Sequence, residues 1–204
     1  MRSVTYFLEN YMKLSCLRPL AALLLTLGLA ACGGKASYEV SGTISGLNNE
    51  GLILANGGDP LPVPAGKTNF TFAKRIDYGT AYDITVKQQP AHMTCGISGG
   101  SGSAGHYINI SAAVTCFQNK YTVGGTISGL TVDGLVLING STLTPVLKDA
   151  TTFTIGGFVA YGETYAISVS AQPKGLQCEL APGTEKGTMG EGNVTALKIA
   201  CKPA

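Results

Sequence analysis

Four cysteines in this chain could form two disulfide bonds or bind a metal ion. Cys95 and Cys116 are 21 residues apart, and Cys178 and Cys201 are 23 residues apart. No Cys-x-x-Cys occurs, so the spacing argues against a metal site. Among the three possible pairings the sequence favours Cys95–Cys116 and Cys178–Cys201, because each pair falls within its own copy of an internal repeat. Closing loops of this length is worth about 3 kcal/mol each.

His92 and His106 flank Cys95, an arrangement that invites a thiol-nucleophile interpretation. The second copy keeps the cysteine, Cys178, but has Gly175 where the first copy has His92. A catalytic thiol would also have to stay unpaired in an oxidising compartment. We therefore expect both histidines to be exposed loop residues, and we expect no enzymatic activity, no cofactor and no metal.

Three carboxylates, Glu179, Glu185 and Glu191, lie between the second pair of cysteines. Carboxylates close in sequence can bind a cation, but these three follow no known metal-binding loop spacing. We therefore expect these three carboxylates to be solvated charges in a loop.

A further cysteine, Cys32, ends a short apolar segment. Residues 19–34 carry no charge, which is 16 residues, whereas a spanning helix needs about 20. Lys13 and Arg18 precede the segment, and small residues stand directly before Cys32, in the order Leu-Ala-Ala-Cys. This pattern resembles the lipobox of bacterial lipoproteins, in which the cysteine is acylated and becomes the first residue of the mature chain.

The resemblance implies a signal peptide at 1–31, with Met12 as an alternative start, and a lipidated tether at 32–37. The tether would bind the membrane through its acyl chains. Gly33 rather than Asp follows the cysteine, which favours the outer membrane over the inner one. We therefore expect a lipid-anchored protein of the cell envelope.

Residues 32–204 contain 11 basic and 11 acidic side chains, so they carry no net charge. A nucleic-acid-binding protein should show a basic stripe, and none is present, so we expect no nucleic-acid partner. Glycine is frequent and separates short runs rich in Val, Ile, Thr, Tyr and Phe. This composition predicts an all-β protein with many turns.

The chain repeats itself. Residues 38–95 align without a gap to residues 121–178 at a shift of 83, and 26 of the 58 aligned positions are identical. The shift becomes 85 by the last cysteine of each copy. A unit of this size is a domain rather than a solenoid repeat. We expect two β-sandwich repeats, at 38–120 and 121–204.

Alternating apolar and polar residues mark the strands of each repeat. We expect strands at 38–44 and 121–127, at 52–54 and 135–137, and at 82–86 and 165–169. Asn56-Gly57 and Asn139-Gly140 predict hairpin turns. About seven strands per repeat indicate a β-sandwich of immunoglobulin-like (Ig-like) size.

Several repeated motifs are similar to tandem Ig-like repeats in secreted proteins and lipoproteins of proteobacteria, which often precede β-propeller or adhesin regions. These motifs are Gly-Thr-Ile-Ser-Gly-Leu, Gly-Leu-x-Leu-x-Asn-Gly, Tyr-Gly-x-x-Tyr-x-Ile-x-Val and Gln-Pro before the cysteine pair. The resemblance covers residues 38–204. It implies a module and carries no catalytic signature.

The two copies diverge most tellingly where Lys74-Arg75 become Gly157-Phe158. The second copy therefore has an apolar loop, and Phe158 and Val159 form a candidate contact patch. Packing or mild exposure of this loop is the favoured alternative. The function classes left open are a structural or interaction module with an unidentified envelope partner, and an adhesin that binds carbohydrate or peptide through its loops.

Overall fold

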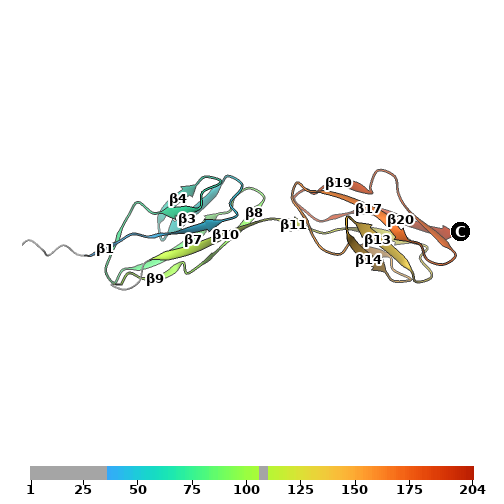
Figure 1. Cartoon of the computed structure of the whole chain (residues 1–204), viewed down its shortest axis with the longest axis horizontal. Coiled ribbons are helices and arrows are strands. Elements are labelled where there is room, and N and C mark those ends of the chain that lie inside the picture. Colours follow the sequence, from blue (N-terminus) through green and yellow to red (C-terminus); the bar gives the residue numbers. More distant parts are fainter. Residues whose placement is uncertain (1–35, 106–109) are drawn as a thin grey trace, which may run out of the picture.

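The computed structural model describes residues 36–105 and 110–204, and in this part of the chain every regular element is a strand. Two units lie end to end, with β1 at one end of the molecule and the C-terminus at the other (Figure 1). Unit 1 comprises residues 36–118, unit 2 comprises residues 120–204, and Asn119 alone separates them. The predicted signal peptide, Cys32 and His106 lie outside the described residues.

In the residues that the structure describes, each unit contains ten strands, several of them only two or three residues long, which is more than the seven or so expected. Unit 1 contains β1 (Ser37–Tyr38), β2 (Ser41–Ser45), β3 (Leu52–Asn56), β4 (Asp59–Val63), β5 (Asn69–Thr71), β6 (Ile76–Asp77), β7 (Ala81–Gln88), β8 (Met93–Ser98), β9 (Ser101–Ser103) and β10 (Ser111–Gln118). Unit 2 contains β11 (Lys120–Tyr121), β12 (Val123–Ser128), β13 (Leu135–Asn139), β14 (Thr142–Val146), β15 (Thr152–Thr154), β16 (Val159–Ala160), β17 (Thr164–Ala171), β18 (Leu176–Leu180), β19 (Lys186–Thr188) and β20 (Val194–Pro203).

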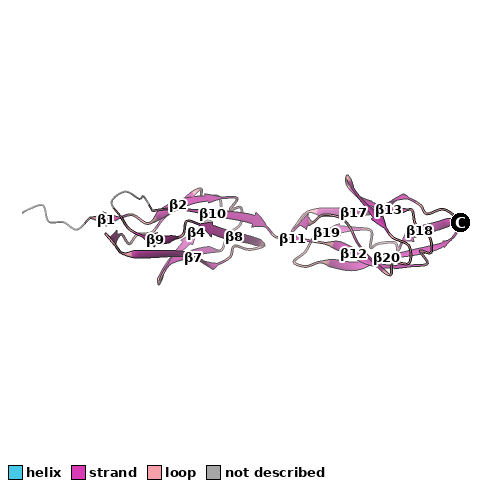
Figure 2. Cartoon of the chain, turned by 90° about the horizontal axis from the view of Figure 1, so that it is seen from below, coloured by secondary structure: helices cyan, strands magenta, loops and turns pink. Residues whose placement is uncertain are grey.

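Both units have the same sheet topology. Two four-stranded sheets, in the orders β5-β2-β10-β8 and β4-β3-β7-β9, make the sandwich of unit 1. The corresponding orders in unit 2 are β15-β12-β20-β18 and β14-β13-β17-β19 (Figure 2). In each unit the first long strand pairs in parallel with the last one, β2 with β10 and β12 with β20. The prediction of two tandem Ig-like β-sandwiches is therefore confirmed.

The predicted continuous strand at 38–44 is wrong, because the chain changes partner in the middle. Tyr38 pairs with Ile76 of β6, whereas Ser41 onward pairs with β5 and β10. Val40, at the change, is fully buried. Unit 2 repeats the break, and Lys120 pairs with Ala160, so β11 begins one residue before the predicted boundary at 121.

The two asparagines of the expected hairpins are the last residues of β3 and β13 rather than turn residues. Gly57 and Gly140 take the positive φ at the turns, 57° and 59°. The Asn56 side chain accepts a hydrogen bond from the Asp83 amide, and Asn139 accepts one from the Ala166 amide. Each asparagine therefore joins its hairpin to the neighbouring long strand.

Each unit has its own hydrophobic core, and the two clusters share no residue. Leu54 in unit 1 and Leu137 in unit 2, which occupy matched positions, are both fully buried. Two separate cores make the units two domains in the physical sense, each with its own source of stability.

The two predicted disulfides are present. Cys95–Cys116 and Cys178–Cys201 join residues directly opposite each other on adjacent strands, β8 with β10 and β18 with β20. Antibody domains instead carry a disulfide that links their two sheets. Here each bridge fastens the last long strand of a unit to its neighbour within one sheet.

Candidate interaction surface and the junction between the units

The most distinctive surface of the described residues is an apolar patch on unit 2. We define it by three strongly exposed side chains, Leu143 at 58%, Leu147 at 75% and Phe158 at 71%. Leu143 lies on β14, an edge strand, and Leu147 directly follows this strand. Leu143 and Leu147 are four residues apart, and the loop that carries Phe158 is hydrogen-bonded to Thr144 between them, so we treat the three side chains as one candidate contact surface.

The strands beneath the patch continue its apolar character. Leu143 stands opposite Ile138 of β13, and Pro145 stands opposite Val136, so these four side chains lie on the same face of the sheet. Ile138 and Val136 are only partly buried. The outer face of this sheet is therefore apolar from its edge to its second strand.

The loop that carries Phe158 is fastened to the edge strand. The Gly156 amide donates a hydrogen bond of 2.8 Å to the Thr144 side-chain oxygen. Unit 1 has Leu61 at the position of Thr144, and this side chain packs on the core instead. This hydrogen bond to the edge strand therefore has no counterpart at Leu61 in unit 1.

Phe158 and Val159, the residues of the predicted contact patch, have different environments. Phe158 is exposed, so the favoured expectation of packing or mild exposure is wrong for this residue. Val159 is half-buried, belongs to β16 and packs against the core of unit 2. Leu143 and Leu147 were missed, although each replaces a proline of the first copy, which was the available signal.

At the matched positions unit 1 has a different surface. Pro60, Pro64 and Arg75 replace Leu143, Leu147 and Phe158. The Arg75 guanidinium donates hydrogen bonds to the side chain and carbonyl of Ser37 and lies 3.6 Å from the Glu39 carboxylate. In unit 1 the residue at the position of Phe158 therefore belongs to a polar network with Ser37 and Glu39.

We expected His92 to be an exposed loop residue, but it lies at the junction between unit 1 and unit 2. Its ring stacks on Tyr161 of unit 2, with centroids 3.8 Å apart and planes inclined by 8°. Its Nδ1 also makes a hydrogen bond with the Glu191 carboxylate. Glu191 thus contacts unit 1, and it is also a mostly exposed charge in a loop, as predicted.

Glu185, the second of the three loop carboxylates, interacts with its own turn. Hydrogen bonding from its own backbone amide, joined by those of Gly183 and Thr184 and by the charge of Lys186, lowers the pKa of its carboxyl despite partial burial. Within the described residues no three His, Cys, Asp or Glu side chains gather closely enough to hold a metal ion.

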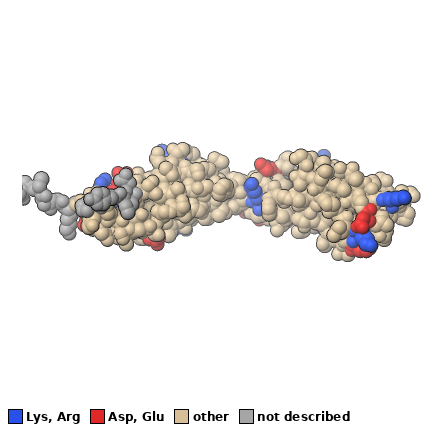
Figure 3. Space-filling model, turned by 60° about the horizontal axis from the view of Figure 1, so that its bottom comes forward, with Lys and Arg blue, Asp and Glu red and all other residues tan. Residues whose placement is uncertain are grey.

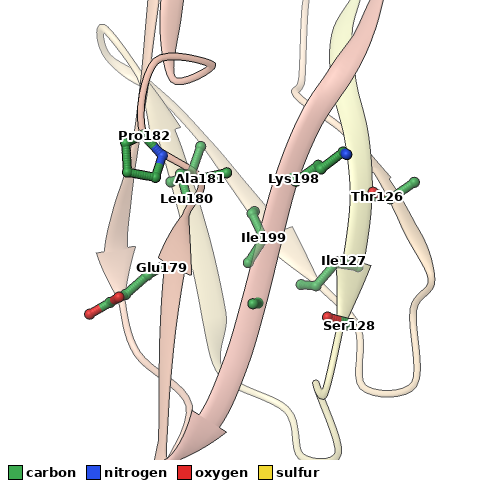
Figure 4. Close-up of a pocket in the computed structure, with 10 residues that line it drawn as sticks. Thr126, Ile127, Ser128, Glu179, Leu180, Ala181, Pro182, Lys198 and Ile199 are labelled. Atoms are coloured by element: carbon green, nitrogen blue, oxygen red, sulfur yellow. The ribbon is translucent and has the colours of Figure 1, made fainter.

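One groove of about 460 Å³ lies on the outer face of unit 2, between β12, β20 and β18. Ile127 and Ile199 in its floor belong to the core, whereas Lys198 and Glu179 are exposed. The Glu179 carboxylate and the Lys198 ammonium point away from each other (Figure 4). The groove therefore offers no pair of converging titratable groups that could act as acid and base.

Charged side chains are few and scattered on the face of the molecule shown in Figure 3, with no continuous stripe of one sign. The described residues contain no helix able to cross a lipid bilayer.

No protein-family model matches the chain, and no curated protein matches it. Among solved structures, it is similar to the shaft pilin SpaA of Lactobacillus rhamnosus GG, at 13% identity and a TM-score of 0.29, over 82% of this chain and 98% of that chain. It is also similar to a streptococcal ancillary pilin, at 14% identity and a TM-score of 0.29, over 82% of this chain and 63% of that chain. Superpositions at this level carry no argument about function, so the strand topology itself defines the chain as two tandem Ig-like β-sandwiches.

Proposed function

We propose that this chain is a non-enzymatic, lipid-anchored protein of the cell envelope that acts as a structural and interaction module. Unit 1 serves as the spacer next to the anchor at Cys32. Unit 2, further along the chain, presents the apolar patch to a partner. The end-to-end arrangement of the units supports this division, because it sets unit 2 at the far end from the start of unit 1 (Figure 1).

The observation that carries the proposal is the contrast between matched surfaces on one fold. Across the same sheet face, unit 2 has Ala166 and Ser170 where unit 1 has Asp83 and Lys87. Together with the replacement of Arg75 by Phe158, three charges of unit 1 are absent from unit 2, and Leu143 and Leu147 stand in place of two exposed prolines. Interface centres are depleted in charge and enriched in aromatic residues, so this change is the expected signature of a contact surface.

The shape of the surface favours a protein partner over a small molecule. Leu143 and Pro145 lie on the outer face of a sheet, and ligand pockets for small molecules are concave and mostly enclosed. The partner we propose is an envelope protein with an apolar surface of its own. Phe158 is the anchor residue of the contact, because buried aromatic side chains commonly dominate binding energy.

The alternative function is that of a surface adhesin for carbohydrate or peptide. An exposed aromatic ring in a loop, Phe158, could stack on a sugar. The edge strand β14 could also receive an extended peptide as an added strand, since it holds one proline, whereas β4 of unit 1 holds two.

The test of the interaction is a pull-down from envelope extract combined with a glycan array, using soluble, oxidised protein of residues 33–204. The variant Leu147→Pro/Phe158→Arg places the residues of unit 1 on unit 2, so we expect the fold to tolerate both. We expect a protein retained by the wild type and lost with the variant. A glycan hit lost with the same variant would instead establish the adhesin, and retention unchanged by the variant would contradict both functions of the patch.

The anchor is tested separately in cells. We expect the full chain to incorporate a clickable palmitate analogue and to fractionate with the outer membrane, and Cys32→Ser to abolish both. Labelling that persists in the Cys32→Ser variant, or a soluble wild-type protein, would refute the anchor without bearing on the patch.

A further inference from the structure

We propose that the His92 side chain, through its contacts with Tyr161 and Glu191, holds unit 1 and unit 2 in one fixed orientation. We call these two contacts the His92 clasp. This inference concerns the junction alone and does not depend on the identity of any partner. With these contacts the two described units form one rigid body and do not move independently on a flexible linker.

The linker itself is a single residue bonded to both units. The Asn119 amide donates to the His92 carbonyl at 2.9 Å, and the Asn119 carbonyl accepts from the Tyr161 amide at 2.8 Å. The Thr94 hydroxyl donates to the Asn119 side-chain oxygen at 2.8 Å. Asn119 therefore has little freedom to change the angle between the units.

The backbone bonds of this junction belong to the repeat, whereas the His92 side chain does not. The same pair of bonds recurs at the outer ends of the molecule, from Tyr78 to the Ala36 carbonyl and from Ala204 to the Gly175 carbonyl. Glycine occupies position 175, so these backbone hydrogen bonds form there without a side chain. The ring of His92 is added only where one unit meets the next.

His92 has this side chain in a backbone conformation that suits glycine better. Its φ is 57°, and the matched Gly175 has a φ of 75°. Among the described residues only one other non-glycine, Asp149, has a positive φ. A side chain kept in this region calls for a compensating contact, and the stack on Tyr161 together with the Glu191 hydrogen bond provides one.

The clasp holds for both protonation states of the imidazole. An ionised carboxylate only accepts hydrogen bonds, so Nδ1 of His92 carries the hydrogen, either in the neutral Nδ1–H tautomer or in the imidazolium. An imidazolium would gain a charge-assisted bond to Glu191 and a cation–π contact with Tyr161. The His92 side chain is 34% exposed and that of Glu191 63%, so the ring stack rather than the ion pair carries the clasp.

The experiment is a measurement of the distance between nitroxide labels, one on each unit, by pulsed electron resonance. The full chain is purified in detergent with labelled cysteines replacing Lys67 and Lys198, both exposed. We expect one narrow distance distribution in the wild type and a broadened, shifted one in His92→Gly. This variant keeps the fold because it installs the residue found at position 175.

Two further variants separate the side-chain contact from a general effect of glycine. Asp149→Gly relieves the other positive φ, at a residue whose amide bonds within unit 2, and should leave the distribution narrow. Tyr161→Leu removes the stacking partner and should broaden it as His92→Gly does. A broad wild-type distribution, a His92→Gly distribution as narrow as the wild type, or equal broadening by Asp149→Gly would each overturn the clasp.

Discussion

Units 1 and 2 have the same fold and equivalent cores, but the residues on their surfaces differ. Leu54 and Leu137 are equally buried, the two disulfides join the same strands, and the sheets have the same order. The differences that bear on contacts lie on the outer face of one sheet, in the loop that carries Phe158 and at the turn that holds His92 or Gly175. Duplication of a fold thus leaves the core under one set of constraints while its surfaces become free to specialise.

The largest expected effect tests the shared core. Leu54→Ala and Leu137→Ala should each destabilise their own unit by about 3–5 kcal/mol, because each opens a cavity among fully buried neighbours. Hydrogen–deuterium exchange resolved by unit measures both. Destabilisation by only one of the two variants would show that the two cores are not equivalent.

Removing a disulfide should have the next largest effect. Cys95→Ser/Cys116→Ser and Cys178→Ser/Cys201→Ser should each cost about 3 kcal/mol, with near equality because the bridged residues are separated by 21 and 23 positions. Urea unfolding of the oxidised variants gives the two values. A several-fold difference between the two losses of unfolding free energy would show that the two disulfides do not stabilise their units equally.

A smaller effect concerns a glutamine found in both units. The Gln89 amide donates to the Cys95 carbonyl and its oxygen accepts from the Cys95 amide, and Gln172 holds Cys178 in the same way. Each →Ala variant should destabilise its unit by about 1–2 kcal/mol, since two partly buried backbone groups lose their partners. Glu variants should retain one of the two bonds and so give intermediate losses by denaturant titration.

Acid should affect unit 2 more than unit 1. The Glu185 carboxyl has a pKa below its ordinary value of 4.5 in the folded protein, so it contributes stability above that value and loses the contribution as pH falls below it. Unit 1 has Gly100 at the corresponding place, where its carbonyl accepts from Ile84 as the Glu185 carbonyl accepts from Ile167. Glu185→Gln should remove the difference between the units, seen as their relative unfolding midpoints at acid and neutral pH.

The smallest expected effect on stability comes from the patch. Leu147→Pro/Phe158→Arg should change the free energy of unfolding by no more than about 0.5 kcal/mol, because both side chains are exposed. It should lower the binding of a hydrophobic dye to the folded protein. Strong destabilisation would mean that these side chains support the fold rather than a contact.

Periodicity and self-similarity made the β-sandwich, the two units and the cysteine pairing predictable, because alternation along a strand and density of identity are local signals. The break at Val40 was not predictable, since it depends on which strands lie alongside. The role of His92 was also missed: the change from His to Gly between copies was visible, but its meaning depends on Tyr161 and Glu191, which lie in the other unit. The Phe158 loop was found through its divergence. Leu143 and Leu147 were missed although each replaces a proline, because their exposure depends on β14 being an edge strand.

The most direct test of the account is photo-crosslinking in intact cells from matched positions of the two units. The full chain carries benzoylphenylalanine at position 158 in one strain and at position 75 in the other. We expect a discrete crosslinked protein partner from position 158 and none from position 75, because position 158 lies in the proposed contact surface and position 75 lies in the matched loop of unit 1. Equal crosslinking from both positions, or crosslinking from position 75 alone, would contradict the specialisation of unit 2.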